Sequence, residues 1–316
     1  MRRAVALALF FAASLAHAQF PNHAVHVVVP FPAGGPTDVL TRALGQKLSE
    51  RWSQPVVVDN KPGAGGAIGS DFVAKSAPDG YTLLMATTST HSIGPSLQKM
   101  PYDPVKDFAP VSTVGFFGMA LLVNPDSPYK SLQDFIAAAK ASPGKFNVGT
   151  TVIGSTQFGA AELLKSMAGI EFQTVPFKAT PAIITAVKGK DLQAMVEILA
   201  PVIPHIKSGN LRALAVTFDH RFVGLPDIPT FAESGVPGYE ASAWNAIAVP
   251  AKTPGPVVAR LNKEIHAAVA APEVRQRLLE LGVDPRASTP EVLRAHLVSE
   301  IAKWKAVIER AKIEKQ

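Results

Sequence analysis

The chain has 316 residues, no cysteine and a formal net charge of +6. The lack of cysteine excludes disulfides, thiol nucleophiles, thiolate zinc sites and iron–sulfur clusters, and the length is sufficient for two domains with separate cores. Lys and Arg are scattered among Asp and Glu rather than gathered in a block, which argues against nucleic-acid binding and leaves at most a slight preference for anionic ligands.

The first eighteen residues have the layout of a secretory signal peptide. Arg2 and Arg3 form a basic start, residues 4–16 form an apolar run, and Ala16-His17-Ala18 is typical of a cleavage site. A transmembrane anchor is the alternative, but the apolar run is shorter than the roughly 20 residues that cross a bilayer. We therefore expect cleavage after Ala18 and a soluble periplasmic protein without the two arginines, which lowers the formal charge from +6 to +4.

From Val25 onward, short β-branched runs alternate with amphipathic helical stretches, which is the pattern of βαβ units. The predicted fold class is α/β with a largely parallel sheet. Predicted strands span residues 26–30, 56–60, 82–87, 120–124, 146–149, 172–176, 194–198, 213–217 and 242–249. Predicted helices span residues 37–52, 67–77, 132–142, 156–168, 182–188, 256–270, 272–281 and 290–312.

The alternation of strand and helix stops after Thr217, where a stretch rich in Pro and Gly occupies residues 225–239. This change predicts that the chain crosses between two lobes twice, near residues 118–124 and again near residues 240–249. We therefore expect lobe I to comprise residues 19–121 and 244–316, and lobe II to comprise residues 122–243.

The turn from Pro30 to Asp38 is the first candidate binding element. Gly35 suits the N-cap of a helix, Pro36 its first position and Asp38 its first turn. A helix start has unpaired N–H groups and a partial positive charge, so it can hold a carboxylate or a phosphate, and the paired glycines allow close approach. Taken alone, the motif fits an ordinary strand-to-helix turn better.

Two later segments repeat this design: residues 149–157, with Ser155 as N-cap, and residues 176–181, with Thr180 as N-cap and Pro181 as the first helical residue. All three lie beyond the carboxyl ends of strands, where open α/β sheets bind ligands. The recurrence predicts an anion site between the lobes, to which the hydroxyls of residues 87–90 contribute unless they only cap the next turn. The candidate residues are Ala33, Gly34, Gly35, Thr37, Asp38, Thr88, Thr90, Thr151, Gly154, Ser155, Thr156, Lys178, Ala179 and Thr180.

Other motifs argue against a cofactor, a metal or an enzyme. The glycines of residues 63–69 imitate a dinucleotide-binding loop, but their spacing departs from that fingerprint and the next acid, Asp79, precedes a strand instead of ending it. No nucleophile with a credible base stands out, so we expect a binding protein. We interpret five histidines without metal-ligand spacing as surface or capping residues: His91, His205, His220, His266 and His296.

Blocks of sequence in a constant order make the chain resemble the Bug-type substrate-binding proteins of tripartite tricarboxylate transporters. These blocks are residues 28–38, 56–66, 77–83, 102–110, 204–209, 211–217 and 225–230. The resemblance implies a two-lobed periplasmic binding protein (type II), with two Rossmann-like α/β domains joined by two hinge crossings. It also implies capture of a di- or aromatic carboxylate and its delivery to integral membrane transporter subunits, and we expect a monomer. A ligand-sensing subunit of a membrane signalling system and a secreted hydrolase are the alternatives.

Three segments depart from the pattern of that family. Ala179-Thr180 replaces a Gly-Gly pair, Thr156-Gln157-Phe158 replaces a stretch that commonly bears histidine, and Glu197-Ile198 replaces an acidic-amide pair. Glu197 becomes a further ligand-binding candidate through this comparison. Its carboxylate would repel an anion unless it points away, is protonated, or pairs with an amine or hydroxyl of the ligand, so the identity of the carboxylate stays open.

Overall fold

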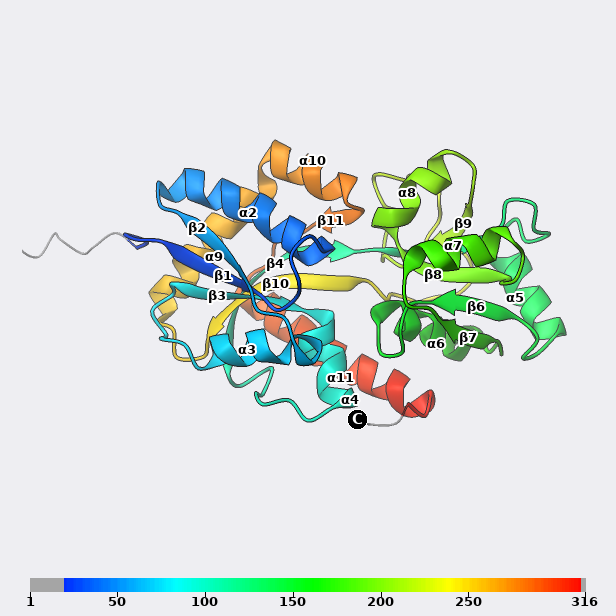
Figure 1. Cartoon of the computed structure of the whole chain (residues 1–316), viewed down its shortest axis with the longest axis horizontal. Coiled ribbons are helices and arrows are strands. Elements are labelled where there is room, and N and C mark those ends of the chain that lie inside the picture. Colours follow the sequence, from blue (N-terminus) through cyan, green and yellow to red (C-terminus); the bar gives the residue numbers. More distant parts are fainter. Residues whose placement is uncertain (1–19, 314–316) are drawn as a thin grey trace, which may run out of the picture.

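A computed structural model describes residues 20–313, which form a six-stranded and a five-stranded sheet lying side by side (Figure 1). The predicted signal peptide, with its cleavage after Ala18, lies outside the described residues. Each sheet has helices on both faces, so each has its own hydrophobic core on either side. The predicted α/β class is confirmed, but the expected largely parallel sheet is not, because both sheets mix parallel and antiparallel strand pairs.

The first sheet has the strand order β11-β4-β10-β3-β1-β2. Strands β1, β2 and β3 are parallel, whereas β10 and β11 run antiparallel to their neighbours. The strands are β1 (Val25–Val29), β2 (Val56–Asn60), β3 (Thr82–Thr87), β4 (Phe108–Phe117), β10 (Ala243–Pro250) and β11 (Val283–Pro285). Helices α2 (Pro36–Trp52), α9 (Gly255–Ala270) and α10 (Pro272–Glu280) cover one face, and α3 (Ala67–Ala74), α4 (Gly94–Leu97) and α11 (Pro290–Arg310) cover the other.

Strand β1, which lies between β3 and β2, shows why both faces of this sheet are covered. Val27 and Val29 belong to the core under α2, while Val28 belongs to the core under α3, because successive side chains of a strand point to opposite faces. Val27 pairs with Val58 on one side and with Leu83 on the other. An uninterrupted valine run is what a parallel strand buried on both faces requires.

The second sheet has the order β7-β6-β8-β5-β9, in which β6 runs parallel to β7 and β8, while β5 runs antiparallel to β8 and β9. Its strands are β5 (Met119–Val123), β6 (Asn147–Thr150), β7 (Gln173–Pro176), β8 (Ala194–Ile198) and β9 (Arg212–Val216). Helices α5 (Leu132–Ala141) and α6 (Thr156–Ala168) pack into one core, and α7 (Thr180–Lys188) and α8 (Leu199–Lys207) pack into the other.

Strands β4 and β11, helix α8 and the helical turns η2 (Ser89–Ile93) and α4 were not predicted from the sequence. In β4, Pro110 interrupts an apolar run and pairs with Ala248 beside a register shift, where a missing N–H is tolerated. The interpretation of His91 as a surface or capping residue is wrong. It is 1% exposed and packs against Tyr102, Phe108 and Trp244, and burial lowers its pKa to about 3, so the ring is neutral.

The chain passes from the first sheet to the second at Gly118 and returns just before β10. Helix α11 forms a further connection, because it packs against β4 while Trp304, Val307 and Ile308 near its end belong to the core of the second sheet. We propose the two lobes with the predicted boundaries moved to these crossings, so that all of β5 belongs to lobe II and all of β10 belongs to lobe I, with the end of α11 resting on lobe II.

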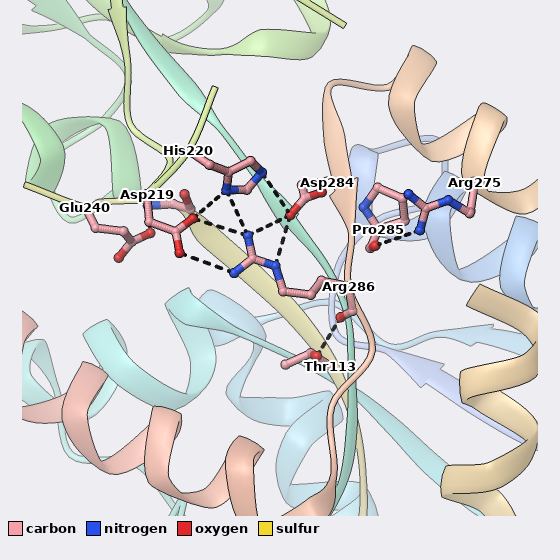
Figure 2. A network of polar contacts seen from close by, with 9 residues as sticks. Thr113, Asp219, His220, Glu240, Arg275, Asp284, Pro285 and Arg286 are labelled. Carbon is pink, nitrogen blue, oxygen red and sulfur yellow. Dashed lines mark hydrogen bonds and ion pairs between the residues drawn. The ribbon is translucent and has the colours of Figure 1, made fainter. Parts of the chain in front are cut away.

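A network of ion pairs joins the lobes on one side of the crossing strands (Figure 2). Arg286, directly after β11, donates to Asp284 at 2.9 Å and to Asp219, which follows β9, at 3.2 Å. Its guanidinium lies 4.9 Å from the ring centroid of Phe116. Burial opposes ionisation of Asp219, but the hydrogen bonds and charges of Arg286 and His220 together outweigh it and lower the pKa of that carboxyl.

The first crossing leaves no room for a side chain at residue 118, which gives a direct test of this packing. A Cβ there would overlap the ring of Phe218, so Gly118→Ala should lower the free energy of unfolding by about 1–3 kcal/mol in urea denaturation. Gly255→Ala is the matched control, because a Cβ at the start of α9 meets no atom within 4 Å. Equal stability of the two variants would contradict the packing described here.

Candidate functional site

A cavity of about 550 Å³ lies between the two lobes. The first lobe contributes the β1–α2 turn, the end of β3 and the start of β10, and the second lobe contributes the start of α6 and the end of β8. The lining residues are Phe31, Pro32, Ala33, Gly35, Pro36, Thr37, Asp38, Thr87, Thr88, Ser89, Phe117, Ser155, Thr156, Gln157, Ile198, Ala243, Trp244 and Asn245.

The start of α2 points its free N–H groups toward this cavity. Gly35 is the N-cap, with extended backbone (φ −74°, ψ 167°), and Pro36 is the first helical residue, as predicted. The first helical hydrogen bond runs from the N–H of Val39 to the carbonyl of Gly35 at 3.0 Å. The N–H groups of Thr37 and Asp38 therefore have no partner within the helix and carry its partial positive charge.

Asp38 shapes this turn with its side chain. It is only 2% exposed and accepts hydrogen bonds from the N–H of Gly34 at 2.8 Å, from Arg42 Nε at 3.0 Å and from Asn60 Nδ2 at 2.9 Å. Burial opposes ionisation, but these donors outweigh it and lower the pKa of Asp38. The ion pair with Arg42 compensates the carboxylate charge, so the positive end of α2 remains available.

The start of α6 faces the same cavity from the second lobe. Ser155 is the N-cap, as predicted, and its hydroxyl accepts from the N–H of Phe158 at 3.1 Å. The N–H of Gly159 bonds to the carbonyl of Ser155, which leaves the N–H groups of Thr156 and Gln157 without a helical partner. Two helix N-termini on different lobes thus meet at one cavity.

Glu197 lies behind this second helix start. Its side chain is fully buried and accepts from Gln157 Nε2, Thr180 Oγ1 and the N–H of Ile198, each at 2.8 Å. Burial raises the pKa of this carboxyl, although the three donors partly offset that rise. The prediction that Thr180 is the N-cap of α7, with Pro181 as the first helical residue, is wrong. Ala179 is the N-cap and Thr180 is the first helical residue. The hydroxyl of Thr180 does not cap the helix but donates to Glu197.

The polar groups of the first lobe are oriented by one another. Asn245 Nδ2 donates to Thr37 Oγ1 at 3.1 Å, so the hydroxyl hydrogen of Thr37 can be donated into the cavity. The N–H of Trp244 donates to Thr88 Oγ1 at 2.6 Å. Within residues 20–313, no Lys or Arg lines the cavity. A negatively charged ligand would therefore be held by N–H groups, hydroxyls and helix ends.

About half of the candidate residues line this cavity: Ala33, Gly35, Thr37, Asp38, Thr88, Ser155 and Thr156. The structure places the others outside the lining: Gly34, Thr90, Thr151, Gly154, Lys178, Ala179, Thr180 and Glu197. Thr90 is buried against Thr87 and His91, and Lys178 is exposed. Sequence reasoning missed the aromatic residues of the lining, Phe31 and Phe117. Phe31 lies next to the glycine pair and Phe117 lies next to the first crossing, and these positions were the available signal.

A family model described as the tripartite tricarboxylate transporter family receptor matches residues 40–313. The chain belongs to this family. It is 37% identical to Protein BugT of Bordetella pertussis over 92% of this chain and 89% of that protein. A structure of a Rhodopseudomonas palustris protein with adipate has a TM-score of 0.78 at 34% identity, covering 94% of this chain and all of the other. MatC of the same organism, with bound malate, has a TM-score of 0.73 at 32% identity, covering 92% and 100%.

These findings confirm the resemblance to Bug-type proteins and the fold class of a two-lobed periplasmic binding protein. The match covers both sheets and the cavity between them, since it extends over more than nine-tenths of the chain. Two relatives hold dicarboxylates, which fits a site built from helix N-termini. The ligand-binding roles of the individual residues stay predictions.

The role of Asp38 in the α2 turn predicts a dependence of stability on pH. Because its pKa in the folded protein is lowered from the ordinary value of 3.8, its contribution is present above that value and is lost as pH falls through the folded pKa. Asp38→Asn should lower the free energy of unfolding by about 1–3 kcal/mol at pH 7, with a smaller difference from the parent near pH 3. Urea titrations at both pH values measure this difference, and Asp227→Asn, at an exposed position, is the control. A loss of unfolding free energy in Asp38→Asn that is the same at both pH values would contradict this role.

Proposed function

We propose that this protein is an extracytoplasmic solute-binding protein that captures a small carboxylate between its lobes and delivers it to the membrane subunits of a tripartite tricarboxylate-type transporter. The observation that carries the proposal is the meeting of the α2 and α6 N-termini at one cavity. Their unpaired N–H groups provide an anion site without a cationic side chain. Membership of a transporter receptor family supports the delivery step.

We place the ligand carboxylate against the α2 turn. Ala33, Gly35 and the N–H groups of Thr37 and Asp38 would contact it, and the hydroxyls of Thr37 and Thr88 lie in the same wall. Opposite them, Ser155 and Thr156 would contact the far end of the ligand once the lobes close. The protein would act in the periplasm as a monomer after cleavage behind Ala18, and it would catalyse no reaction. No helix among residues 20–313 is long and apolar enough to cross a membrane.

A thermal-shift screen of the mature protein against aliphatic and aromatic carboxylates tests the function directly. A ligand at a hundred times its dissociation constant should add about 2.7 kcal/mol of stability. Gly35→Leu should then weaken binding by about tenfold or more in calorimetry, because the side chain would block approach to the helix start. Gly255→Leu is the matched control, since Gly255 also precedes a proline at a helix start but lies outside the cavity. Unchanged affinity of Gly35→Leu would contradict the role of this turn.

Ligand binding should also draw the lobes together, because neither lobe alone surrounds the cavity and the crossings near Gly118 and Ser242 can absorb the rotation. Small-angle X-ray scattering should show a smaller radius of gyration with saturating ligand than without it. Gly35→Leu at the same ligand concentration should keep the larger radius. A ligand that binds tightly to an open form without changing the radius would count against closure.

A further inference from the structure

The ligand cavity and the ion-pair network of Figure 2 lie on opposite sides of the segments that cross between the lobes. In the first sheet, β4 and β10 adjoin the crossings and separate β1 and β3 from β11. In the second sheet, β5 adjoins the first crossing and separates β6 and β8 from β9. The cavity is lined from the ends of β1, β3 and β8 and from the start of α6, whereas the network joins residues that follow β11 and β9.

A rotation about the crossing segments therefore has opposite effects on the two sides. Two-lobed proteins commonly close around a ligand by rotating about a few hinge residues. A rotation that brings the ends of β1 and β3 closer to β8 and α6 narrows the cavity. The same rotation moves the residues after β11 away from the residues after β9, so contacts between them must lengthen when the cavity closes.

Arg286 is the residue of the network that links the two lobes. Its Nη2 atom donates to Oδ1 of Asp219 in lobe II at 3.2 Å and to Oδ2 of Asp284 in lobe I at 2.9 Å. The same atom lies 3.1 Å from Nδ1 of His220 in lobe II. Because Asp284 belongs to the same lobe as Arg286, it holds the guanidinium in place while the lobes move. Only the contacts to lobe II are stretched, and hydrogen bonds weaken steeply outside a narrow range of distance and angle.

The other contacts on this side tolerate movement better than the ion pair does. Phe116 of β4 and Leu279 of α10 pack against the apolar core that lies under α7 and α8 in lobe II. Apolar contact is non-directional, so these side chains can slide without a large loss. The side chains of Arg286 and Asp219 are 42% and 58% exposed, and water weakens an ion pair at such a position. The pair can therefore shift the balance between two arrangements of the lobes without fixing either.

We propose that the ion pair between Arg286 and Asp219 opposes closure of the ligand cavity, and that it thereby lowers the affinity for the ligand without touching it. The apparent dissociation constant is the intrinsic constant divided by the fraction of molecules in the binding-competent form. A contact that is lost on closure reduces this fraction. The inference rests on the proposed function, because it assumes that the ligand binds between the lobes and that the closed form binds it best.

The first test measures the distance between the lobes without any ligand. The chain has no cysteine, so Val57→Cys on β2 and Gln173→Cys on β7 can carry one spin label each. Both positions are exposed, and both strands are the sheet edges on the cavity side. In double electron–electron resonance, adding Asp219→Asn to this labelled protein should shift the distance distribution toward shorter distances. The fraction of molecules with the shorter distances should rise about two- to fivefold, as expected for loss of a partly exposed ion pair.

The second test measures affinity by isothermal titration calorimetry of the unlabelled mature protein, with malate, adipate and benzoate as probes. Asp219→Asn should bind each probe that the parent binds about two- to fivefold more tightly than the parent does. Arg286→Gln should also tighten binding. The double variant should bind no more tightly than the tighter of the two single variants, because both changes remove the same contact.

Glu233→Gln is the matched control, because Glu233 pairs with Arg221 within lobe II at 3.1 Å and both side chains are about half exposed. It should leave the label distances and the affinities unchanged. Unchanged or longer label distances in Asp219→Asn would overturn the inference and leave the proposed function standing. So would an Asp219→Asn variant that is folded by circular dichroism and binds the probes no more tightly than the parent. Binding of none of the three probes would count against the proposed function, and the label distances would then decide the inference alone.

Discussion

The unpaired N–H groups at the starts of α2 and α6 are the feature on which the rest of the site depends. A helix start needs hydrogen-bond acceptors. Asp38 in the first turn of α2 turns back only as far as the N–H of Gly34, before the helix, and α6 has no acidic residue in its first turn. Both starts lie at the carboxyl ends of interior strands, β1 in one sheet and β6 in the other, each of which is next to an edge strand. In the proposed function, a ligand anion would supply the acceptors that the two helices lack, and it would do so for both lobes at once.

Two buried carboxylates support these helix starts in opposite ways. Asp38 has Arg42 as a partner and gains charged and neutral donors, so its pKa is lowered and its charge is compensated. Burial raises the pKa of Glu197, and its hydrogen-bond donors, which are all neutral, only partly offset that rise. The same functional group therefore has a lowered pKa behind one helix start and a raised pKa behind the other, because only Asp38 has a cationic partner.

The two crossing segments are not the only contacts that connect the lobes within the described residues. Besides the crossings at Gly118 and before β10, the end of α11 packs into the second lobe, and Arg286 pairs with Asp219 across the lobe boundary. Phe116 contacts Arg286 while the next residue, Phe117, lines the ligand cavity. Because adjacent residues of a strand point to opposite faces, the ion-pair network and the cavity lie on opposite sides of the hinge. A rotation that closes the cavity must therefore act on the network as well.

The sequence alone determined the α/β class, most strand positions, the Gly35 and Ser155 caps and the family, because these depend on local periodicity, turn chemistry and residue blocks. It did not reveal β4, whose Pro110 conceals a strand that pairing with β10 and β11 stabilises. Nor did it assign Thr180, whose hydroxyl suits a cap equally well but bonds to Glu197, a residue 17 positions away. The aromatic residues of the lining and the orientation of Glu197 were decided by tertiary structure, since they depend on which faces of two separate sheets meet, and no local pattern encodes that meeting.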